Sequence, residues 1–219
     1  MEVCAMGVHK YKYNWSFFEQ DSEELYYFLG FVAADGYISE NEIEIGLNER
    51  DVALLEQFRD LIVPDKPLHY KPKTNSYTLK ISCRSKIPHF KKFFDMSSNK
   101  KHDEMIFPDI PKRYYKDFIR GYVDGDGSLD TTKGYRGDKV YVGPRLRILG
   151  NPEFLRGLNE VTKTQYYHKT NAINRKGKEN VYVITYNFKT AREILKWLYS
   201  DNHICLDRKY TTYLKLLNL

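Results

Sequence analysis

Two short segments of the chain carry the same pattern of residues, and each ends in an acidic residue followed by glycine. The first is YFLGFVAADGYI, residues 27–38, and the second is FIRGYVDGDGSL, residues 118–129. Aligned without gaps, they place Asp35 opposite Asp126. The two acids are about 90 residues apart, which is the length of a small domain. A repeat at this spacing predicts that the chain is two copies of one structural unit.

The position of these acids suggests metal chemistry. Each follows an apolar segment that predicts a buried helix, so its carboxylate faces the negative end of a helix dipole. Two such helices side by side would bring Asp35 and Asp126 together, and a divalent cation would relieve their repulsion. Carboxylate oxygens are hard ligands that suit Mg²⁺. The alternative is that each Asp-Gly is only a turn, with Gly36 and Gly127 supplying a positive φ. Because the pattern occurs twice, we favour a paired-carboxylate metal site.

Small residues at helical spacing indicate how the two helices meet. Gly30 and Ala34 lie one turn apart on one face, and Gly121 and Gly125 do the same in the second copy. Two such faces allow helix backbones to approach closely. We therefore expect the two motif helices to pack against each other, and the competing arrangement is that each packs only on its own sheet.

The segments after each motif predict the same order of elements in both copies. Alternating residues predict the first strands, at residues 42–47 and around residues 145–148. Asp51 and Asn151-Pro152 then begin amphipathic helices. A second strand and another helix follow in each copy, with the strands at residues 77–83 and 181–188. We predict an α+β fold of two pseudo-symmetric α-β-β-α-β-β-α repeats, over residues 1–112 and 113–219, with about nine extra residues near 133–143 in the second.

Composition excludes several classes of protein. The chain has 219 residues, of which 42% are apolar, enough for a buried core. No apolar run approaches the ~18 residues of a membrane span, and the N-terminus lacks the apolar segment of a secretion signal. We therefore expect an intracellular protein, in a bacterial or phage-host cytoplasm or an organelle, that has no membrane partner. The three cysteines are too far apart for a disulfide framework or a zinc site. The net charge of +6 is compatible with a polyanionic partner.

FLGFVAADG and FIRGYVDGDG resemble the signature of the LAGLIDADG homing endonucleases, in the single-chain form that carries two motifs. The resemblance covers nearly the whole chain. The second motif is close to the family pattern, whereas the first has Ala33 where the second has Asp124. The family's metal-binding acid matches Asp35 and Asp126, and both are present.

The resemblance implies a pseudo-twofold monomer that cuts both strands of a long, pseudo-symmetric DNA target. The motif helices would form the interface, and two four-stranded antiparallel sheets would form a saddle on the DNA. Asp35 and Asp126 would hold Mg²⁺ at the centre, with Ala34 and Gly125 beside them in the metal site. Mn²⁺ would substitute for Mg²⁺, and Ca²⁺ would support binding without cleavage.

The resemblance also implies a polar residue near the end of the second strand and a lysine before the last helix of each half. Glu49 is the candidate for positioning water, with Asn48 as the alternative. For the lysines, the candidates are Lys101, with Lys100 as its neighbour, and Lys209, next to Arg208. A lysine in these positions would stabilise developing negative charge.

Contacts to DNA should come from the strand faces opposite the apolar ones. The candidates for reading bases are Lys80, Ser82, Arg84, Arg145 and Arg147. Glu42 and Glu44 could also accept hydrogen bonds from cytosine, or lie on the outer surface. Cations in the loops predict contacts to phosphate, and these are Lys71, Lys73, Arg136, Lys139, Arg175, Lys176 and Lys178.

Other functions remain open on the sequence alone. A DNA-binding regulator that has lost catalysis would have the same fold, although both acids are retained here. A maturase that splices intron RNA would also have this fold, so intron RNA is a second candidate partner. A Ca²⁺ loop at Asp124, Asp126 and Ser128 is disfavoured, because Tyr135 occupies the position where an EF-hand loop needs glutamate.

Overall fold

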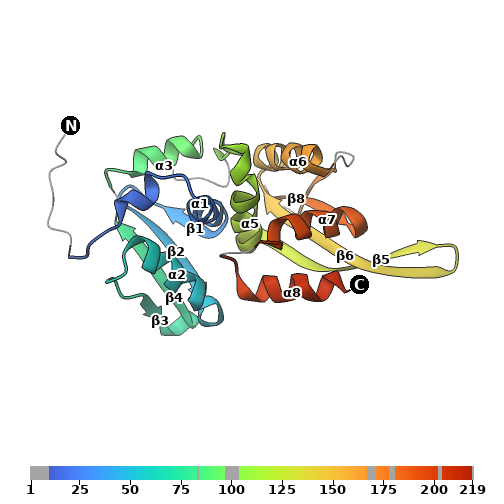
Figure 1. The fold of residues 1–219 in the computed structure, drawn as a ribbon, viewed down its shortest axis with the longest axis horizontal. Helices are drawn as coiled ribbons and strands as arrows, with labels where there is room; N and C mark the ends of the chain where they lie inside the picture. The colour runs from blue at the N-terminus through green and yellow to red at the C-terminus, as the bar shows by residue number, and fades with distance from the viewer. Residues whose placement is uncertain are drawn as a thin grey trace.

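The computed structural model describes residues 10–82, 84–96, 104–166, 171–177, 181–201 and 204–218. The two motif helices, α1 (Glu23–Asp35) and α5 (Tyr115–Asp126), lie side by side in the middle of the molecule. One sheet lies on each side of this pair (Figure 1). The expected contact between the motif helices is therefore present.

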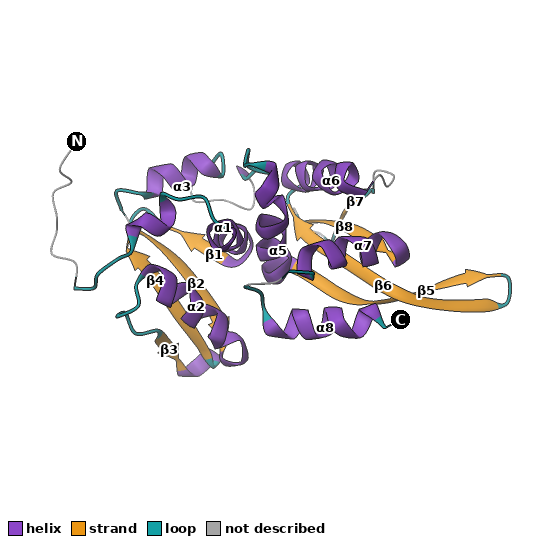
Figure 2. Ribbon diagram, viewed as in Figure 1, coloured by secondary structure: helices purple, strands orange, loops and turns teal. Residues whose placement is uncertain are grey.

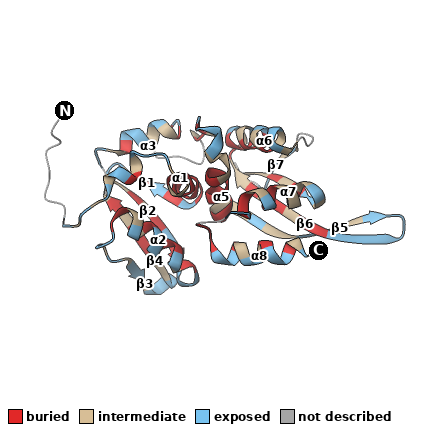
Figure 3. Cartoon of the chain, viewed as in Figure 1, coloured by how far each residue is buried: buried red, intermediate tan, exposed pale blue. Residues whose placement is uncertain are grey.

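Ser22 caps the start of helix α1. The Oγ atom of Ser22 accepts a hydrogen bond from the backbone N–H of Leu25, and two glutamates follow in the first turn. From Leu25 to Ala34 every residue is buried, because apolar side chains surround the helix. Figure 3 shows α1 and α5 as the most continuously buried helices of the fold.

Glycines set the distance between the two helices. A Cβ atom at Gly30 would lie 2.0 Å from the carbonyl oxygen of Phe118, and one at Gly121 would lie 2.1 Å from the carbonyl oxygen of Tyr27. At the next turn, a Cβ atom at Gly125 would lie 2.3 Å from the Cβ of Ala34. The backbones therefore touch along one face, and no larger residue fits at either crossing point.

The first repeat forms a four-stranded antiparallel sheet in the order β1-β2-β4-β3. Helix α2 packs on the apolar face of this sheet, where Ile43, Ile45, Leu79 and Ile81 are fully or almost fully buried. The strands are β1 (Gly36–Ile38), β2 (Glu42–Asn48), β3 (His69–Lys71) and β4 (Ser76–Ser82). The helices are α2 (Val52–Ile62) and α3 (Ile87–Phe93), with short 3-10 turns η1 (Trp15–Phe18), η2 (Glu49–Asp51) and η3 (Pro72–Thr74).

The second repeat has the same strand order, β5-β6-β8-β7 (Figure 2). The strands are β5 (Gly127–Arg136), β6 (Lys139–Gly150), β7 (Ile173–Arg175) and β8 (Tyr182–Asn187). The helices are α6 (Pro152–Tyr166), α7 (Phe188–Tyr199) and α8 (Asp207–Leu217), and the 3-10 turn η4 (Lys112–Tyr114) precedes α5. Asn151 caps α6 as predicted, because its Oδ1 accepts from the N–H of Phe154 at 2.9 Å.

Two features of this repeat differ from the sequence-based prediction. The extra residues near 133–143 form the outer part of a long β5–β6 hairpin, which extends away from the body of the molecule (Figure 1). Its glycines have a packing reason: Cβ atoms at Gly134 and Gly143 would lie 2.7 and 2.6 Å from the ring of Phe188. Helix α8 is an addition to the predicted seven-element unit, and it follows α7 along the chain.

None of the helices in the described ranges is both long enough and apolar enough to cross a bilayer.

The close helix contact generates the first prediction. Gly121→Ala should reduce the free energy of unfolding by about 3 kcal/mol, the upper end for overpacking a core, because its methyl group would meet backbone atoms. Gly46→Ala is the matched control, since its nearest side-chain neighbour, Thr78 Oγ1, would lie 3.7 Å away. Urea unfolding of both variants measures the difference. Equal stability of the two variants would show that α1 and α5 do not pack as closely as described.

Candidate active site and nucleic-acid interface

The two motif carboxylates lie at the same end of the helix pair. Asp35 is the last residue of α1 and is exposed, and Asp126 is the last residue of α5 and is partly exposed. The Oδ2 atom of Asp35 is 3.3 Å from the position that a Cβ at Gly125 would take, so it lies next to the partner helix. Burial raises the pKa of Tyr122, and the charges of Asp126 and Asp35 raise it further. Both carboxylates therefore lie close enough to Tyr122 for their charges to affect its hydroxyl group.

The glycines after these acids do not form left-handed caps. Gly36 has φ −75° and Gly127 has φ −84°, so both are extended and start a strand directly. Their small size is needed for a different reason, because a Cβ at Gly36 would lie 2.7 Å from the backbone of Val32. The alternative interpretation, a turn with positive φ at these glycines, is therefore wrong, and each Asp-Gly pair connects a helix directly to a strand.

The donor set suits a hard divalent cation. In the described part of the chain, no group of three or more His, Cys, Asp or Glu residues forms a metal cluster. Mg²⁺ does not need one, since it commonly binds through one or two carboxylates, several waters and the phosphates of a substrate. Asp35 and Asp126 supply two carboxylates at an open helix end, which fits such an ion. The carbonyl groups of Ala34 and Gly125 lie beside them, at the same end of the two helices.

Asp124 has a structural environment that the sequence did not reveal. It is fully buried, and its carboxylate accepts hydrogen bonds from the Tyr27 hydroxyl at 2.8 Å, the Tyr199 hydroxyl at 2.6 Å and the Leu206 N–H at 2.8 Å. Burial raises the pKa values of both phenols, so they remain protonated donors. Because Tyr27 belongs to α1, this network joins the two halves, and the first motif has only Ala33 at the equivalent place.

Lys209 lies within α8 and not before it. Its ammonium group donates to the carbonyl oxygens of Val123, of Gly125 at 3.3 Å and of Gly127 at 2.7 Å, all at the end of α5. Burial lowers the pKa of Lys209 to about 8, although the charge of Asp124 opposes this. Three carbonyl groups use the three N–H donors of an ammonium group. The ammonium group thus caps the negative end of α5. The charges of Asp35 and Asp126 also act on it and raise its pKa, so it lies near both motif acids, and its catalytic role stays a prediction.

A second cross-link joins α8 to the first half. The Nε atom of Arg208 lies 2.9 Å from Oδ2 of Asp51 and 3.2 Å from its Oδ1. Asp51 is buried and occupies the N-cap position of α2, yet its side chain makes no capping hydrogen bond. The sequence predicted a helix cap here, and the structure shows an ion pair between the halves.

Glu49 follows the end of β2 and begins the turn η2, whereas Gly36, next to Asp35, pairs with Ile45 within β2. The carboxylate of Glu49 accepts from Nδ2 of Asn75 at 2.9 Å. The side chain of the alternative, Asn48, is also bonded locally, to the N–H of Arg50 and the carbonyl of Asn75. The role of either residue in positioning water stays a prediction. Lys100 and Lys101 lie outside the described residues.

The polar face of the first sheet carries a compact charge cluster. The Nζ atom of Lys80 lies 3.0 Å from Glu42 and 2.9 Å from Glu44, and Lys71 lies 2.9 Å from Glu44. Glu42, Glu44 and Lys80 alternate with buried residues of β2 and β4, so they lie on the face predicted to meet DNA. Glu42 and Glu44 are thus partners of the lysines. Ser82 is partly exposed on the same strand.

The polar face of the second sheet carries two arginines and one acid. Asp130 of β5 accepts from Arg145 through Nε at 2.7 Å and Nη2 at 3.0 Å, and from Nη2 of Arg147 at 2.6 Å. Burial tends to raise the pKa of Asp130, but these arginines outweigh it and hold the pKa below its usual value. Arg145 and Arg147 are adjacent on one face, as predicted, and Asp130 is the residue that sequence reasoning missed.

The remaining predicted contacts are spread over both halves. Arg84 lies in a turn after β4, so its assignment to the strand face is corrected. Lys71 and Arg175 end the short strands β3 and β7, and Lys73 lies in η3. Arg136 and Lys139 flank the turn of the β5–β6 hairpin, where they form a pair across the strands. Lys176 follows β7 and is exposed. Lys178 lies outside the described residues.

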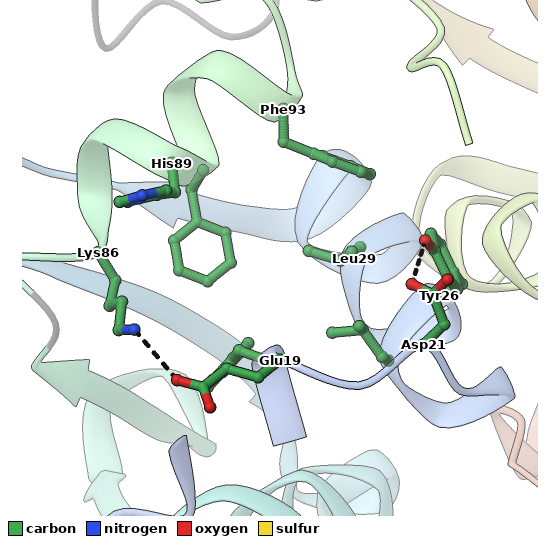
Figure 4. A pocket seen from close by; sticks show the side chains of 10 residues that line it. Glu19, Asp21, Tyr26, Leu29, Lys86, His89 and Phe93 are labelled. Atoms are coloured by element: carbon green, nitrogen blue, oxygen red, sulfur yellow. Dashed lines mark hydrogen bonds and ion pairs between the residues drawn. The ribbon is translucent and has the colours of Figure 1, made fainter. Parts of the chain in front are cut away.

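A cavity of about 330 Å³ lies elsewhere, between the N-terminal part of α1 and α3 (Figure 4). Leu29, Phe90 and Phe93 are among the apolar residues that line it, and an ion pair between Lys86 and Glu19 lies at its edge. The motif carboxylates are at the other end of α1 and do not line this cavity. The candidate site therefore consists of the carboxyl ends of α1 and α5 and the polar faces of the two sheets, and does not include this cavity.

Neighbouring acids in the second motif should respond differently to the same substitution. Asp124→Asn should reduce the free energy of unfolding by about 1–3 kcal/mol, because an amide cannot accept from all three buried donors. Asp126→Asn should leave stability unchanged or raise it, because it removes a charge at the negative end of a helix. Urea unfolding of both variants measures this. A larger loss for Asp126→Asn would contradict the assignment of Asp124 as the structural acid.

No family model matches the chain, and no curated protein matches it by sequence. Solved structures do match. The LAGLIDADG homing endonuclease I-LtrWI bound to target DNA is 13% identical, with a TM-score of 0.59, over 87% of this chain and 88% of that one. I-SmaMI bound to uncleaved DNA in the presence of calcium ions is 11% identical, with a TM-score of 0.62, over 91% and 90%. The LAGLIDADG meganuclease I-AabMI bound to uncleaved DNA is 12% identical, with a TM-score of 0.59, over 88% and 90%. The chain therefore has the fold of the single-chain LAGLIDADG homing endonucleases, which confirms what its two motifs predicted.

Proposed function

We propose that this protein is a metal-dependent, site-specific endonuclease that cuts both strands of a long DNA target as a monomer. The observation that carries the proposal is the paired carboxylates, Asp35 and Asp126, at one end of two tightly packed helices. The fold supports it, because solved structures with this fold are homing endonucleases bound to DNA.

The residues would divide the work as follows. Asp35 and Asp126 would hold the metal, and the backbone at Ala34 and Gly125 would border its site. A bound Mg²⁺ would supply an activated water and stabilise the leaving oxygen of a phosphodiester. The close approach of α1 and α5 fixes the separation of the two carboxylates, so each strand of the duplex would meet one of them. Lys209 would keep the end of α5 in place by binding its carbonyl groups.

The two sheets would hold the duplex. Their polar faces carry cations in both halves, with lysines on β3 and β4 and arginines on β6. Phosphate contacts of the hairpin and loop cations would place the DNA, and side chains of the strand faces would read its bases.

Metal dependence tests the catalytic part of the proposal. Duplexes selected from a randomised DNA library serve as substrate. Cleavage should require Mg²⁺ or Mn²⁺ and should stop in EDTA. Asp35→Asn and Asp126→Asn should each reduce cleavage by about 100-fold or more, in keeping with the loss of a catalytic metal ligand. Both should still bind the duplex in Ca²⁺.

Undiminished cleavage in EDTA would refute the proposed metal site. Specific binding with no cleavage under any metal would instead support the alternative, a DNA-binding or intron RNA-splicing protein on the same fold. Tight binding to structured RNA in preference to the selected duplex would favour the splicing role.

The division between base reading and phosphate contact gives another prediction. Arg147→Ala should relax the preference at one or two base pairs, at a cost of about 1–3 kcal/mol for each bidentate pair of hydrogen bonds that it removes. Lys176→Ala should weaken binding to all sequences alike and reduce the salt dependence by about one counterion. Binding-site selection with both variants at two salt concentrations measures these effects. A change of base preference in Lys176→Ala but not in Arg147→Ala would show that the strand faces are assigned wrongly.

A further inference from the structure

Asp130 lies where it can control the orientation of both arginines on the second sheet. Strand register places it directly opposite Arg145, and Ser128 opposite Arg147. One carboxylate oxygen binds Nε of Arg145, and the other binds Nη2 of both arginines. A single acid therefore bridges two guanidinium groups that lie two residues apart on one strand.

The mode of contact differs between the two arginines. Asp130 accepts two hydrogen bonds from one edge of the Arg145 guanidinium group, from Nε at 2.7 Å and from one N–H of Nη2 at 3.0 Å. A guanidinium group has five N–H donors in a rigid plane. These two hydrogen bonds leave the other edge of the group, formed by Nη1 and the second N–H of Nη2, for another acceptor. Arg147 is bound through Nη2 alone, and its Nε is buried without a hydrogen-bond partner in the described structure.

The edge of a guanidinium group that Nη1 and Nη2 form has the spacing that matches two acceptors of guanine, O6 and N7. The side chain of arginine is long and flexible, and orienting it costs conformational entropy at the moment of binding. A carboxylate that already holds the side of the group removes part of this cost. It also fixes the plane of the guanidinium, which a bidentate contact requires.

The first sheet offers no equivalent arrangement among its described residues. There Lys80 is bound by two acids, Glu42 and Glu44. The ammonium group of a lysine is a compact charge without a fixed plane, so these acids neutralise it and cannot orient a bidentate edge. An oriented reader of guanine is thus expected in the second half.

We propose that Asp130 is a positioning residue that aligns Arg145 for bidentate recognition of one guanine in the DNA target. This inference rests on the proposed function, and it names the base class that one half of the interface reads. In this role Asp130 acts on DNA recognition through the arginine that it orients.

Binding-site selection with full-length protein in Ca²⁺ tests the inference, using randomised duplex oligonucleotides as the probe. The variants are Asp130→Asn, Arg145→Ala and the double variant. Asp138→Asn is the matched control, because it removes the same charge from the turn of the same hairpin. Thermal unfolding of each variant checks that the fold is retained.

Wild-type protein should select guanine at a position where Arg145→Ala loses the preference. Asp130→Asn should reduce that preference by about tenfold, in the range for one bidentate contact. It should have no further effect when Arg145 is already alanine. Asp138→Asn should leave every base preference unchanged, and both charge-removing variants should bind unselected DNA at least as tightly as wild type.

Three results would count against these ideas in different ways. If wild type selected no sequence at all, the proposed function would fail, and the inference with it. If wild type were selective and Asp130→Asn kept the full guanine preference, only the inference would be overturned. An equal loss of affinity for every sequence in Asp130→Asn would give Asp130 a purely structural role and would also overturn it.

Discussion

The close approach of α1 and α5 is the constraint on which the rest of the structure depends. Backbone meets backbone at Gly30 and Gly121, so the two helices cannot slide or rotate without a clash. This contact brings the carboxyl ends of both helices together, and with them two acids that repel each other and the helix dipoles. The two acids therefore lower the stability of the helix pair on which they lie. Burial of nearly all of α1 supplies the free energy that offsets this repulsion.

Polar contacts surround the end of the helix pair and tie the two halves together. The second half surrounds the end of α5 with polar partners: Lys209 binds its carbonyl groups, and Asp124 collects donors from α1, α7 and the start of α8. The first motif has Ala33 where the second has Asp124, so the buried carboxylate belongs to the second motif alone. Arg208 then ties α8 to Asp51 in the first half. Helix α8 thus contacts both repeats. The residues that make these contacts, Leu206, Arg208 and Lys209, lie in its first turn or just before it.

The sequence predicted what depends on local pattern, and missed what depends on long-range pairing. The motif helices, the order of helices and strands along the chain and the cap at Asn151 follow from apolar spacing and capping residues. The pairing of Asp130 with Arg145 required the hairpin register, which the Gly137-Asp138 turn would have supplied, since Gly137 has the positive φ of a two-residue turn. The resemblance singled out Lys209, but its contacts to the carbonyls at the end of α5 were not predicted, because backbone partners leave no pattern in the sequence. Glu49 was proposed from the resemblance, and its contact with Asn75 depends on a side chain 26 residues away, which no local pattern indicates.

The β5–β6 hairpin is longer than the β1–β2 hairpin, so the two halves of the molecule present sheets of different length. Strand β5 has 10 residues, whereas its counterpart β1 has 3. Ten residues of extended strand span about 33 Å, close to one turn of B-form DNA. If the chain binds a duplex as proposed, the second half covers more of it than the first. The complex would then be polar, so the protein could sit on a given site in only one orientation, and a perfect palindrome would be a poor target despite the internal symmetry of the fold.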